Sequence, residues 1–283
     1  LELAYSNLDR LVLRWLDEKI ELTDQQQQQV KQALDEHLAW HCVAHLPAYA
    51  DLLDNLHKDL SNNSVTHDQL ISYGDQIAAF GKDLVIVTRP TAVALLASLS
   101  DDQITALETS FEESNQELLD SLSEPDPSQR VDERHDRMIE RFARFMGKPT
   151  QAQRDAIMQW SQNYRPITGF QLAYSYEWQS ELLNALEIRQ SQPAEFSKRI
   201  TLLFDPGAGW SAPYRKAVRA NQEATWQLVS EVLSQLSGSQ QRRMMRKLAS
   251  YSEDFDRLSC QSSEGVVLSP KTKEAPSGSL SQS

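Results

Sequence analysis

The sequence has little of what defines a membrane-spanning, disulfide-rich or nucleic-acid-binding protein. Its apolar runs fall short of the roughly 18 to 20 residues that a membrane span requires. Two cysteines in 283 residues, Cys42 and Cys260, fit neither a metal knuckle nor a disulfide framework. They either form one bridge in an oxidising compartment or remain two thiols. A formal net charge of −12 leaves no basic patch to neutralise phosphates, so we expect no nucleic-acid partner.

The motifs of catalysis are also missing. No G-x-S-x-G elbow, no Cys/His pattern and no pair of catalytic carboxylates can be argued from the spacing of residues. The G-x-G at Gly207 and Gly209 follows no predicted strand, and we interpret it as a loop. The acidic face of residues 132–140 is typical of a solvated helix. We therefore predict a protein without enzymatic activity.

A short motif recurs along the chain: Ser or Thr, two arbitrary residues, then Gln. This is the capping box, in which the hydroxyl accepts the N–H of the third helical residue and the Gln side chain accepts the N–H of the cap residue. An apolar or aromatic residue follows seven positions after each Ser or Thr, as on the buried stripe of an amphipathic helix. The five copies are Thr23…Gln26, Thr66…Gln69, Ser100…Gln103, Thr150…Gln153 and Ser237…Gln240. We attribute two further matches, Thr168…Gln171 and Ser279…Gln282, to chance.

These five helix starts, together with few glycines and scarce β-branched runs, predict an all-α fold. We expect an antiparallel multi-helix bundle, elongated or curved. A linker at 123–127 separates an N-terminal helical half, 1–122, from a C-terminal half, 128–260, packed on it as one continuous domain. Residues 261–283 are polar and without periodicity, and they are predicted to form a disordered tail.

Proline predicts two irregularities within these halves. Arg89-Pro90 should kink or break the helix that follows Thr66, because proline lacks the backbone N–H and its ring clashes with the preceding turn. Pro166 should kink a long helix that runs from Thr150 to about Gln190. Both helices should therefore change direction at the proline.

Aromatic side chains supply the first candidate site. Several of them could line a groove for a partner, although helical spacing would also place many of them in the core. The candidate binding residues are Trp40, His41, Tyr49, Trp160, Tyr164 and Trp178.

A row of histidines supplies the second candidate site. His37, His41 and His45 lie at positions i, i+4 and i+8, a spacing that suits zinc or copper on one helix face. Alternatively, His41 and His45 belong to the apolar stripe of their helix as hydrogen-bonded core or groove residues. We expect no cofactor, and bound zinc or copper is the alternative.

The capping boxes resemble a known motif. Leu-Ser/Thr-x-x-Gln at the start of antiparallel helices is similar to the LTxxQ motif of the small periplasmic Spy/CpxP-type stress proteins. Those proteins are all-helical, and some act as ATP-independent chaperones through a concave surface. The resemblance implies a chaperone-like activity in the periplasm.

The order of segments over about residues 4 to 258 resembles an uncharacterised family of bacterial lipoproteins, defined only as a domain of unknown function. The matching segments are Tyr5-Ser6-Asn7-Leu8-Asp9, Leu22-Thr23-Asp24-Gln25-Gln26, Trp40-His41 with Leu46-Pro47-Ala48-Tyr49, Leu99-Ser100-Asp101-Asp102-Gln103, Arg141-Phe142-Ala143-Arg144-Phe145-Met146-Gly147 and Leu236-Ser237 with Gln240. In that family a lipidated cysteine precedes the first segment, in which Ser6 here replaces an Asn. The resemblance implies an envelope lipoprotein that faces the periplasm, with the signal peptide and anchor cysteine removed from this chain.

The sequence thus supports one leading hypothesis and one alternative. The leading hypothesis is a non-enzymatic, membrane-anchored envelope lipoprotein that binds an envelope protein or an unfolded client through a helical groove, as a chaperone does. It would touch the membrane only through its lipid anchor. The alternative is a metal-binding periplasmic sensor or carrier that uses the helix face of His37, His41 and His45. A third hypothesis, a hydrolase that acts on the cell wall, is supported only by the periplasmic location that the resemblance implies.

Overall fold

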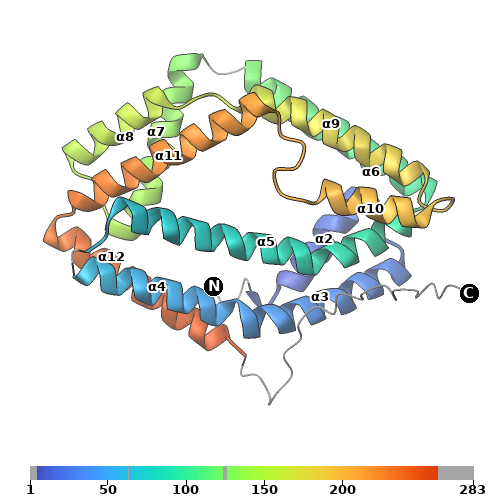
Figure 1. Ribbon diagram of the computed structural model, residues 1–283, viewed down its shortest axis with the longest axis horizontal. Helices are drawn as coiled ribbons and strands as arrows, with labels where there is room; N and C mark the ends of the chain where they lie inside the picture. The colour runs from blue at the N-terminus through green and yellow to red at the C-terminus, as the bar shows by residue number, and fades with distance from the viewer. Residues whose placement is uncertain (1–4, 63, 124–125, 261–283) are drawn as a thin grey trace, which may run out of the picture.

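The chain folds into helices joined by short connections (Figure 1). The computed structural model describes residues 5–62, 64–123 and 126–260, and no strand occurs among them, which confirms the predicted all-α helical bundle. The tail predicted for 261–283 lies outside the described residues. The helices are α2 (Leu8–Ile20), α3 (Asp24–Ala44), α4 (Leu46–Ser61), α5 (His67–Ala97), α6 (Asp101–Ser123), α7 (Pro127–Met146), α8 (Gln151–Asn163), α9 (Thr168–Glu187), α10 (Pro193–Leu203), α11 (Ala212–Ser234) and α12 (Gly238–Leu258). Within the described residues no single helix is long and apolar enough to cross a membrane; α5 and the first part of α6 meet that test only as a pair, bent by 119°.

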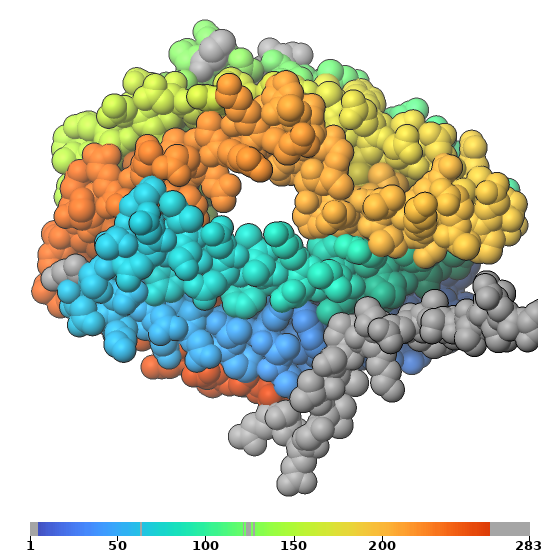
Figure 2. All heavy atoms as spheres, viewed as in Figure 1, coloured from blue at the N-terminus to red at the C-terminus, as the bar shows by residue number. Residues whose placement is uncertain are grey.

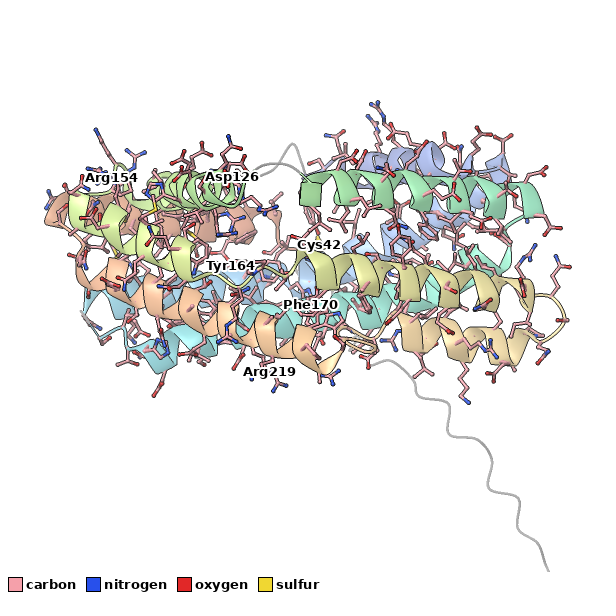
Figure 3. All side chains as sticks on the ribbon, turned by 90° about the horizontal axis from the view of Figure 1, so that it is seen from above. Cys42, Asp126, Arg154, Tyr164, Phe170 and Arg219 are labelled. Atoms are coloured by element: carbon pink, nitrogen blue, oxygen red, sulfur yellow. A yellow bond between two sulfur atoms is a disulfide. The ribbon has the colours of Figure 1, made fainter. Side chains whose placement is uncertain are left out.

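The helices are arranged as a flat ring. α3, α4 and α5 run along one long side of the ring, and α8, α9 and α11 run along the other (Figure 1). The space-filling view shows an opening through the middle, between α5 and the segment that leads from α10 into α11 (Figure 2). Seen from above, Tyr164 and Phe170 flank the connection where α8 passes into α9 (Figure 3).

Two hydrophobic centres lie at opposite ends of this ring (Figure 1). The first joins α4, α7, α8, α11 and α12, and its buried residues include Leu60, Ile157, Val232 and Leu248. The second joins α5, α6, α9 and α10 around Leu186, Phe196 and Ile200, and it continues into a cluster of Ile20, Leu22 and Leu99. Both predicted halves of the sequence contribute to each centre, because α4 packs with helices that follow residue 127 and α9 and α10 pack with α5 and α6.

Pro90 does not end a helix. α5 continues through it from His67 to Ala97, so of the predicted kink or break, the break does not occur. Beyond the proline, Thr91 Oγ1 lies 2.8 Å from Nε2 of His37 on α3, and Val93 packs against the second hydrophobic centre. These contacts stabilise the helical turn after Pro90, where proline cannot donate the usual backbone hydrogen bond.

Pro166, in contrast, separates two helices. The long helix predicted from Thr150 to about Gln190 is interrupted at residues 164–167, between α8 and α9. The residue before a proline avoids the helical conformation. Here that residue is Arg165, whose backbone N–H donates to Asn221 Oδ1 at 2.9 Å and whose carbonyl accepts from Asn221 Nδ2 at 2.8 Å. One side chain of α11 thus satisfies both backbone groups that the interruption would otherwise leave unpaired.

All five predicted capping boxes are formed. Each Ser or Thr hydroxyl accepts the backbone N–H of its Gln, and each Gln side chain accepts the N–H of the cap residue, at distances between 2.8 and 3.3 Å. The match at Thr168 is not a box, because α9 is capped at Ile167 without a side-chain hydrogen bond. The match at Ser279 lies outside the described residues. The motif therefore marks real helix starts at the five predicted places.

Four of the five glutamines also pair with one another. Gln26 at the start of α3 and Gln103 at the start of α6 exchange two amide hydrogen bonds, with Nε2 to Oε1 distances of 3.0 and 2.7 Å. Gln153 of α8 and Gln240 of α12 do the same at 3.3 and 2.9 Å. We call these two sites the glutamine crossings. They lie at the two ends of the ring, where each joins two helix starts that are far apart in the sequence (Figure 1).

Each crossing uses the full hydrogen-bonding capacity of its amides, which is two acceptor sites on oxygen and two donor hydrogens on nitrogen. The oxygen accepts from the cap residue and from the partner amide, and the nitrogen donates to the partner amide and to a backbone carbonyl. For Gln26, Gln103, Gln153 and Gln240 these carbonyls belong to Ser98, Glu21, Gln235 and Lys148. Each of these carbonyls belongs to the residue two positions before the N-cap residue of the partner helix. A capping box accepts Glu as well as Gln, but only Gln can donate the two bonds of a crossing.

α12 closes the ring against α4. Cys42, near the end of α3, and Cys260, just after α12, form a disulfide with Cα atoms 5.1 Å apart, and the Cys260 N–H donates to the Cys42 carbonyl at 3.0 Å. At the other end of α12, Gln241 Nε2 donates to the Leu60 carbonyl at the end of α4, at 3.1 Å. Of the two states that the sequence left open for the cysteines, the structure has the bridge.

A close approach of α5 to α11 gives a testable prediction. A Cβ atom on Gly74 would lie 2.2 Å from Cζ2 of the Trp226 indole, far inside van der Waals contact. We expect Gly74→Ala to lower the free energy of unfolding by about 2 kcal/mol, a typical cost of overpacking, because the indole must leave the contact. Gly81, on the same helix, has nothing within 4 Å of its Cβ position, so Gly81→Ala should raise the free energy of unfolding by up to about 1 kcal/mol. Urea unfolding measures both, and equal effects would contradict the close packing at Gly74.

Candidate binding sites

The six predicted binding residues do not share one groove. Trp40, His41 and Tyr49 belong to a ring cluster on α3 and α4, Trp160 and Tyr164 line a pocket beside α7, and Trp178 lines a groove between α9 and α10. Each of the three places has its own chemistry.

The cluster on α3 and α4 consists of aromatic rings around two histidines. His41 lies between two phenols, with Nδ1 3.1 Å from the Tyr5 hydroxyl and Nε2 3.2 Å from the Tyr49 hydroxyl. The Tyr49 hydroxyl is also 3.3 Å from Nδ1 of His45, and its ring lies edge-on to Phe80 of α5, with centroids 4.8 Å apart. The geometry thus matches the alternative interpretation of His41 and His45 as hydrogen-bonded residues of their helix face.

The three histidines do not converge on a common point. His37 Nε2 faces Thr91 of α5, and His45 Nε2 lies 3.6 Å from Asp83 Oδ2, whereas both nitrogens of His41 face phenols. Within the described residues, no group of three or more His, Cys, Asp or Glu side chains is placed to hold a metal ion. Zinc or copper binding at this face, and the sensor or carrier function that would follow from it, stays a prediction.

Burial sets the protonation of this cluster. Burial lowers the pKa of His37, His41 and His45, and the neighbouring His45 lowers the pKa of His41 further, while Asp83 opposes the shift at His45. A histidine whose pKa is lowered by folding binds its proton more readily in the unfolded chain. Its contribution to stability is therefore fully present above the ordinary histidine pKa of about 6.5 and is lost as the pH falls below that value.

We expect the melting temperature of the wild type to fall as the pH is lowered from about 7.5 to about 5.5. It should fall less in His41→Gln, because this variant lacks one of the histidines whose pKa is lowered by folding. The amide of Gln can still bond to a phenol, which limits the direct cost of the substitution. His57→Gln is the control, because His57 is on α4 and makes none of the ring contacts of the cluster. If His41→Gln and wild type lose the same amount of stability over this range, burial of His41 is not the cause.

A pocket of about 540 Å³ lies between α7 and the connection from α8 to α9. α7 supplies four arginines to its lining, Arg130, Arg134, Arg137 and Arg141. Their spacing of four, three and four residues puts them on one face of the helix. The described residues that line it include no aspartate and no glutamate. We call this site the arginine pocket.

Aromatic side chains form another wall of the arginine pocket. The rings of Trp160 and Tyr164 lie edge to face with centroids 5.6 Å apart. The Arg134 guanidinium lies over the Tyr164 ring, 4.4 Å from its centroid, and donates from Nη1 to the Ser161 carbonyl at 2.8 Å. Burial lowers the pKa of Arg134, whereas Tyr164 raises it, and an arginine stays charged in either case. The pocket thus combines fixed positive charge with an aromatic surface.

Sequence reasoning missed this site. The net charge of −12 predicted that the chain has no basic patch, and at this pocket the prediction is wrong. The acidic residues between 132 and 140 lie beside the arginines on the same helix, and Glu133 pairs with Arg137, so the net charge of this segment does not reveal a basic face. The signal that could have revealed the pocket is the helical spacing of the arginines between 130 and 141.

The α9–α10 groove is a second hollow, of about 720 Å³. Its aromatic and aliphatic lining consists of Tyr174, Tyr176, Trp178, Leu202, Leu203 and Ala208. Trp178 is fixed there, because its Nε1 donates to the Leu203 carbonyl at 3.0 Å. Tyr176 and Leu202, in contrast, keep 47% and 59% of their surface exposed. The groove therefore presents apolar side chains to solvent on a rigid base.

The fold and these sites define a class: an all-helical ring with ligand-sized hollows beside its helix connections. Residues 18–215 match a family of unknown function, DUF6279, and the chain belongs to this family. A search of curated proteins and a search of solved structures each found no match. Membership of an uncharacterised family is thus confirmed, and the family brings no activity with it, so the function must be argued from the geometry.

Proposed function

We propose that this chain is a non-enzymatic binding protein of the bacterial cell envelope that holds an extended or unfolded segment of another protein in the α9–α10 groove. The observation that carries the proposal is the exposure of Tyr176 and Leu202 beside the fixed Trp178 ring. Aromatic and aliphatic side chains that stay exposed together in a concave surface are typical of sites for other proteins.

The charges of the groove favour one kind of segment. Glu177 and Glu181 lie one turn apart on α9 among the lining residues, and Arg199, the one arginine among the described lining residues, is paired with Glu195 at 3.2 Å. A segment that combines apolar side chains with lysine or arginine would complement both the rings and the carboxylates. The net charge of −12 would attract the same segment from a distance.

The Cys42–Cys260 disulfide supports the envelope part of the proposal. Disulfides form and persist in oxidising compartments such as the bacterial periplasm. The lipoprotein resemblance of the sequence implies the same compartment. We therefore propose a chaperone-like lipoprotein that faces the periplasm and meets the membrane only through a lipid anchor.

Light scattering by a client protein that aggregates after reduction of its disulfides tests the proposal, under conditions in which the Cys42–Cys260 bridge is shown by mass to persist. We expect the chain to slow aggregation at equimolar ratio, and Tyr176→Ser and Leu202→Ser to weaken the effect several-fold. Ile86→Ser is the matched control, because Ile86 is similarly exposed, at 51%, on α5 and does not line the groove.

Two results would overturn the proposal. One is the absence of any effect on aggregation at several-fold excess of the chain. The other is an equal loss of the effect in Ile86→Ser, which would assign it to general surface hydrophobicity rather than to the groove. A photo-activated cross-linker placed at position 202 should capture the client, whereas one at position 86 should not.

A further inference from the structure

We infer that the arginine pocket binds a phosphorylated organic molecule, with the phosphoryl group on the arginines of α7 and an apolar or ring-containing body against Trp160 and Tyr164. The inference does not rest on the proposed function, because the α9–α10 groove is a separate hollow with different lining residues.

Most of the positive charge in the pocket is uncompensated. Four guanidinium groups line the pocket, and within the described residues only Arg137 of the four is in an ion pair, with Glu133 at 3.4 Å. Cations gathered on one wall repel one another and create a positive potential that an anion relieves. The planar fork of a guanidinium matches the oxygens of a phosphate. Several forks on one face suit a phosphate dianion better than a single carboxylate.

Two of the arginines are held in place without being neutralised. Arg134 Nη1 donates to the Ser161 carbonyl at 2.8 Å, and Arg130 Nη1 donates to the Leu122 carbonyl at 3.2 Å. A carbonyl oxygen fixes a guanidinium but leaves its full charge, and each of these bonds uses one of five N–H donors. Groups held in this way lose little conformational freedom when a ligand binds, which favours affinity.

The size and the surface of the pocket suit a small molecule. A volume of about 540 Å³ lies within the range of roughly 300 to 1,000 Å³ that is usual for small-molecule sites. The Trp160 and Tyr164 rings line the pocket beside the arginines, with Arg134 over the Tyr164 ring, and Trp160 is fixed by a hydrogen bond from Nε1 to Thr225 Oγ1 at 3.2 Å. The pocket therefore fits a molecule with one anionic end and one apolar end, rather than a polymer.

Calorimetric titration with 1-naphthyl phosphate tests the inference, with inorganic phosphate and 1-naphthol as the two halves of the probe. We expect the whole probe to bind at least about tenfold more tightly than either half. The variant Arg137→Gln with Arg141→Gln should weaken binding about tenfold, which corresponds to loss of charge-assisted hydrogen bonds. Arg137 and Arg141 are both exposed, so this double variant should fold. Arg134→Gln should weaken binding at least as much, and circular dichroism would check that it folds.

Arg144→Gln is the matched control, because Arg144 is exposed on the same helix and does not line the pocket. Its affinity for the probe should match wild type. The inference is overturned if 1-naphthyl phosphate shows no binding at about 1 mM, if 1-naphthoate binds as tightly, or if Arg144→Gln loses as much affinity as the pocket variants. None of these results would alter the aggregation assay that tests the α9–α10 groove.

Two further titrations distinguish the sources of the phosphoryl group. Monomeric dihexanoyl phosphatidic acid carries it as a lipid headgroup, and glycerol 3-phosphate carries it as a free phosphate ester; both are monoesters that can carry two negative charges. Tighter binding of the lipid assigns the pocket to a membrane-derived ligand, and tighter binding of the free ester assigns it to a soluble one. If neither binds while 1-naphthyl phosphate does, the pocket takes an aromatic phosphate.

Discussion

Gln153→Ala should lower the free energy of unfolding by about 4 kcal/mol, well beyond the cost of losing a helix cap. The Gln153 side chain is fully buried, at 0% exposure, and bonds to the N–H of Thr150, to the amide of Gln240 and to the carbonyls of Val232 and Gln235. Alanine would take away the partner of the buried Gln240 amide and the side-chain bonds of the Thr150 N–H and the Gln235 carbonyl, whereas the Val232 carbonyl would keep its bond from the Gln235 N–H. Each unsatisfied buried polar group costs about 1 to 3 kcal/mol.

Gln69→Ala is the matched control for this prediction. Gln69 occupies the same position of the same motif, but it is only partly buried and its Nε2 donates to Asp59 Oδ2, at 3.3 Å, rather than to a second glutamine. Its loss should cost about 1 kcal/mol, the usual effect of removing a cap. Urea unfolding of the two variants gives the comparison directly. A Gln153→Ala variant that is no less stable than Gln69→Ala would show that the crossing contributes nothing.

Gln153→Glu separates capping from crossing. Glutamate can replace glutamine in a capping box, so the substitution would be nearly neutral if Gln153 only capped α8. A carboxylate cannot donate to Gln240 or to the two carbonyls, and it would bring a charge into a buried site. We therefore expect Gln153→Glu to be about as destabilising as Gln153→Ala.

Loss of the Cys42–Cys260 disulfide should lower the free energy of unfolding by about 4 kcal/mol, through a larger conformational entropy of the unfolded chain. The bridge joins residues 218 positions apart, so it constrains most of the chain. The double variant Cys42→Ser with Cys260→Ser tests this without leaving a free thiol. Its melting temperature should lie well below that of the oxidised wild type and close to that of the reduced wild type.

The fold itself should survive the loss of the bridge. α12 keeps its hydrogen bonds to α4, from Gln241 to the Leu60 carbonyl and from Ser252 to the Ala50 carbonyl. The far-ultraviolet circular dichroism of the double variant at low temperature should therefore match wild type. A reductant should have no effect on the melting of the double variant, and a wild-type melting temperature that is unchanged by reductant would contradict a stabilising bridge.

The helix starts could be predicted from sequence because a capping box is local. All the atoms that form it belong to four consecutive residues, so Thr23 and Gln26 reveal it without knowledge of any other helix. The glutamine crossings could not be predicted in this way. Gln69 has the same local sequence pattern and bonds to Asp59, since the partner of a glutamine depends on which helix starts meet in space.

The prolines and the pockets show the same limit. Pro90 and Pro166 obey one local rule, yet α5 continues through the first and α8 ends before the second, because contacts with α3 and α11 decide the outcome. The arginines of α7 could have been found by spacing, but their aromatic wall comes from α8, so sequence alone could not unite them. For a related reason, the aromatic residues predicted to share one groove lie apart. Trp40, Trp160 and Trp178 belong to different helices, and their side chains lie in different parts of the ring.

The closure of the ring by its last helix has a consequence for the order of folding. α4 is made early, yet its partner α12 and the cysteine that binds Cys42 are the last described parts of the chain to be synthesised. Contacts between such distant residues give a high contact order, which slows folding. Until α12 is in place, Gln153 lacks its hydrogen bonds with Gln240, and the apolar face of α4 lacks the helix against which it packs. The chain therefore stays an open ring until α12 packs on α4, and its incomplete first hydrophobic centre is exposed to aggregation until then.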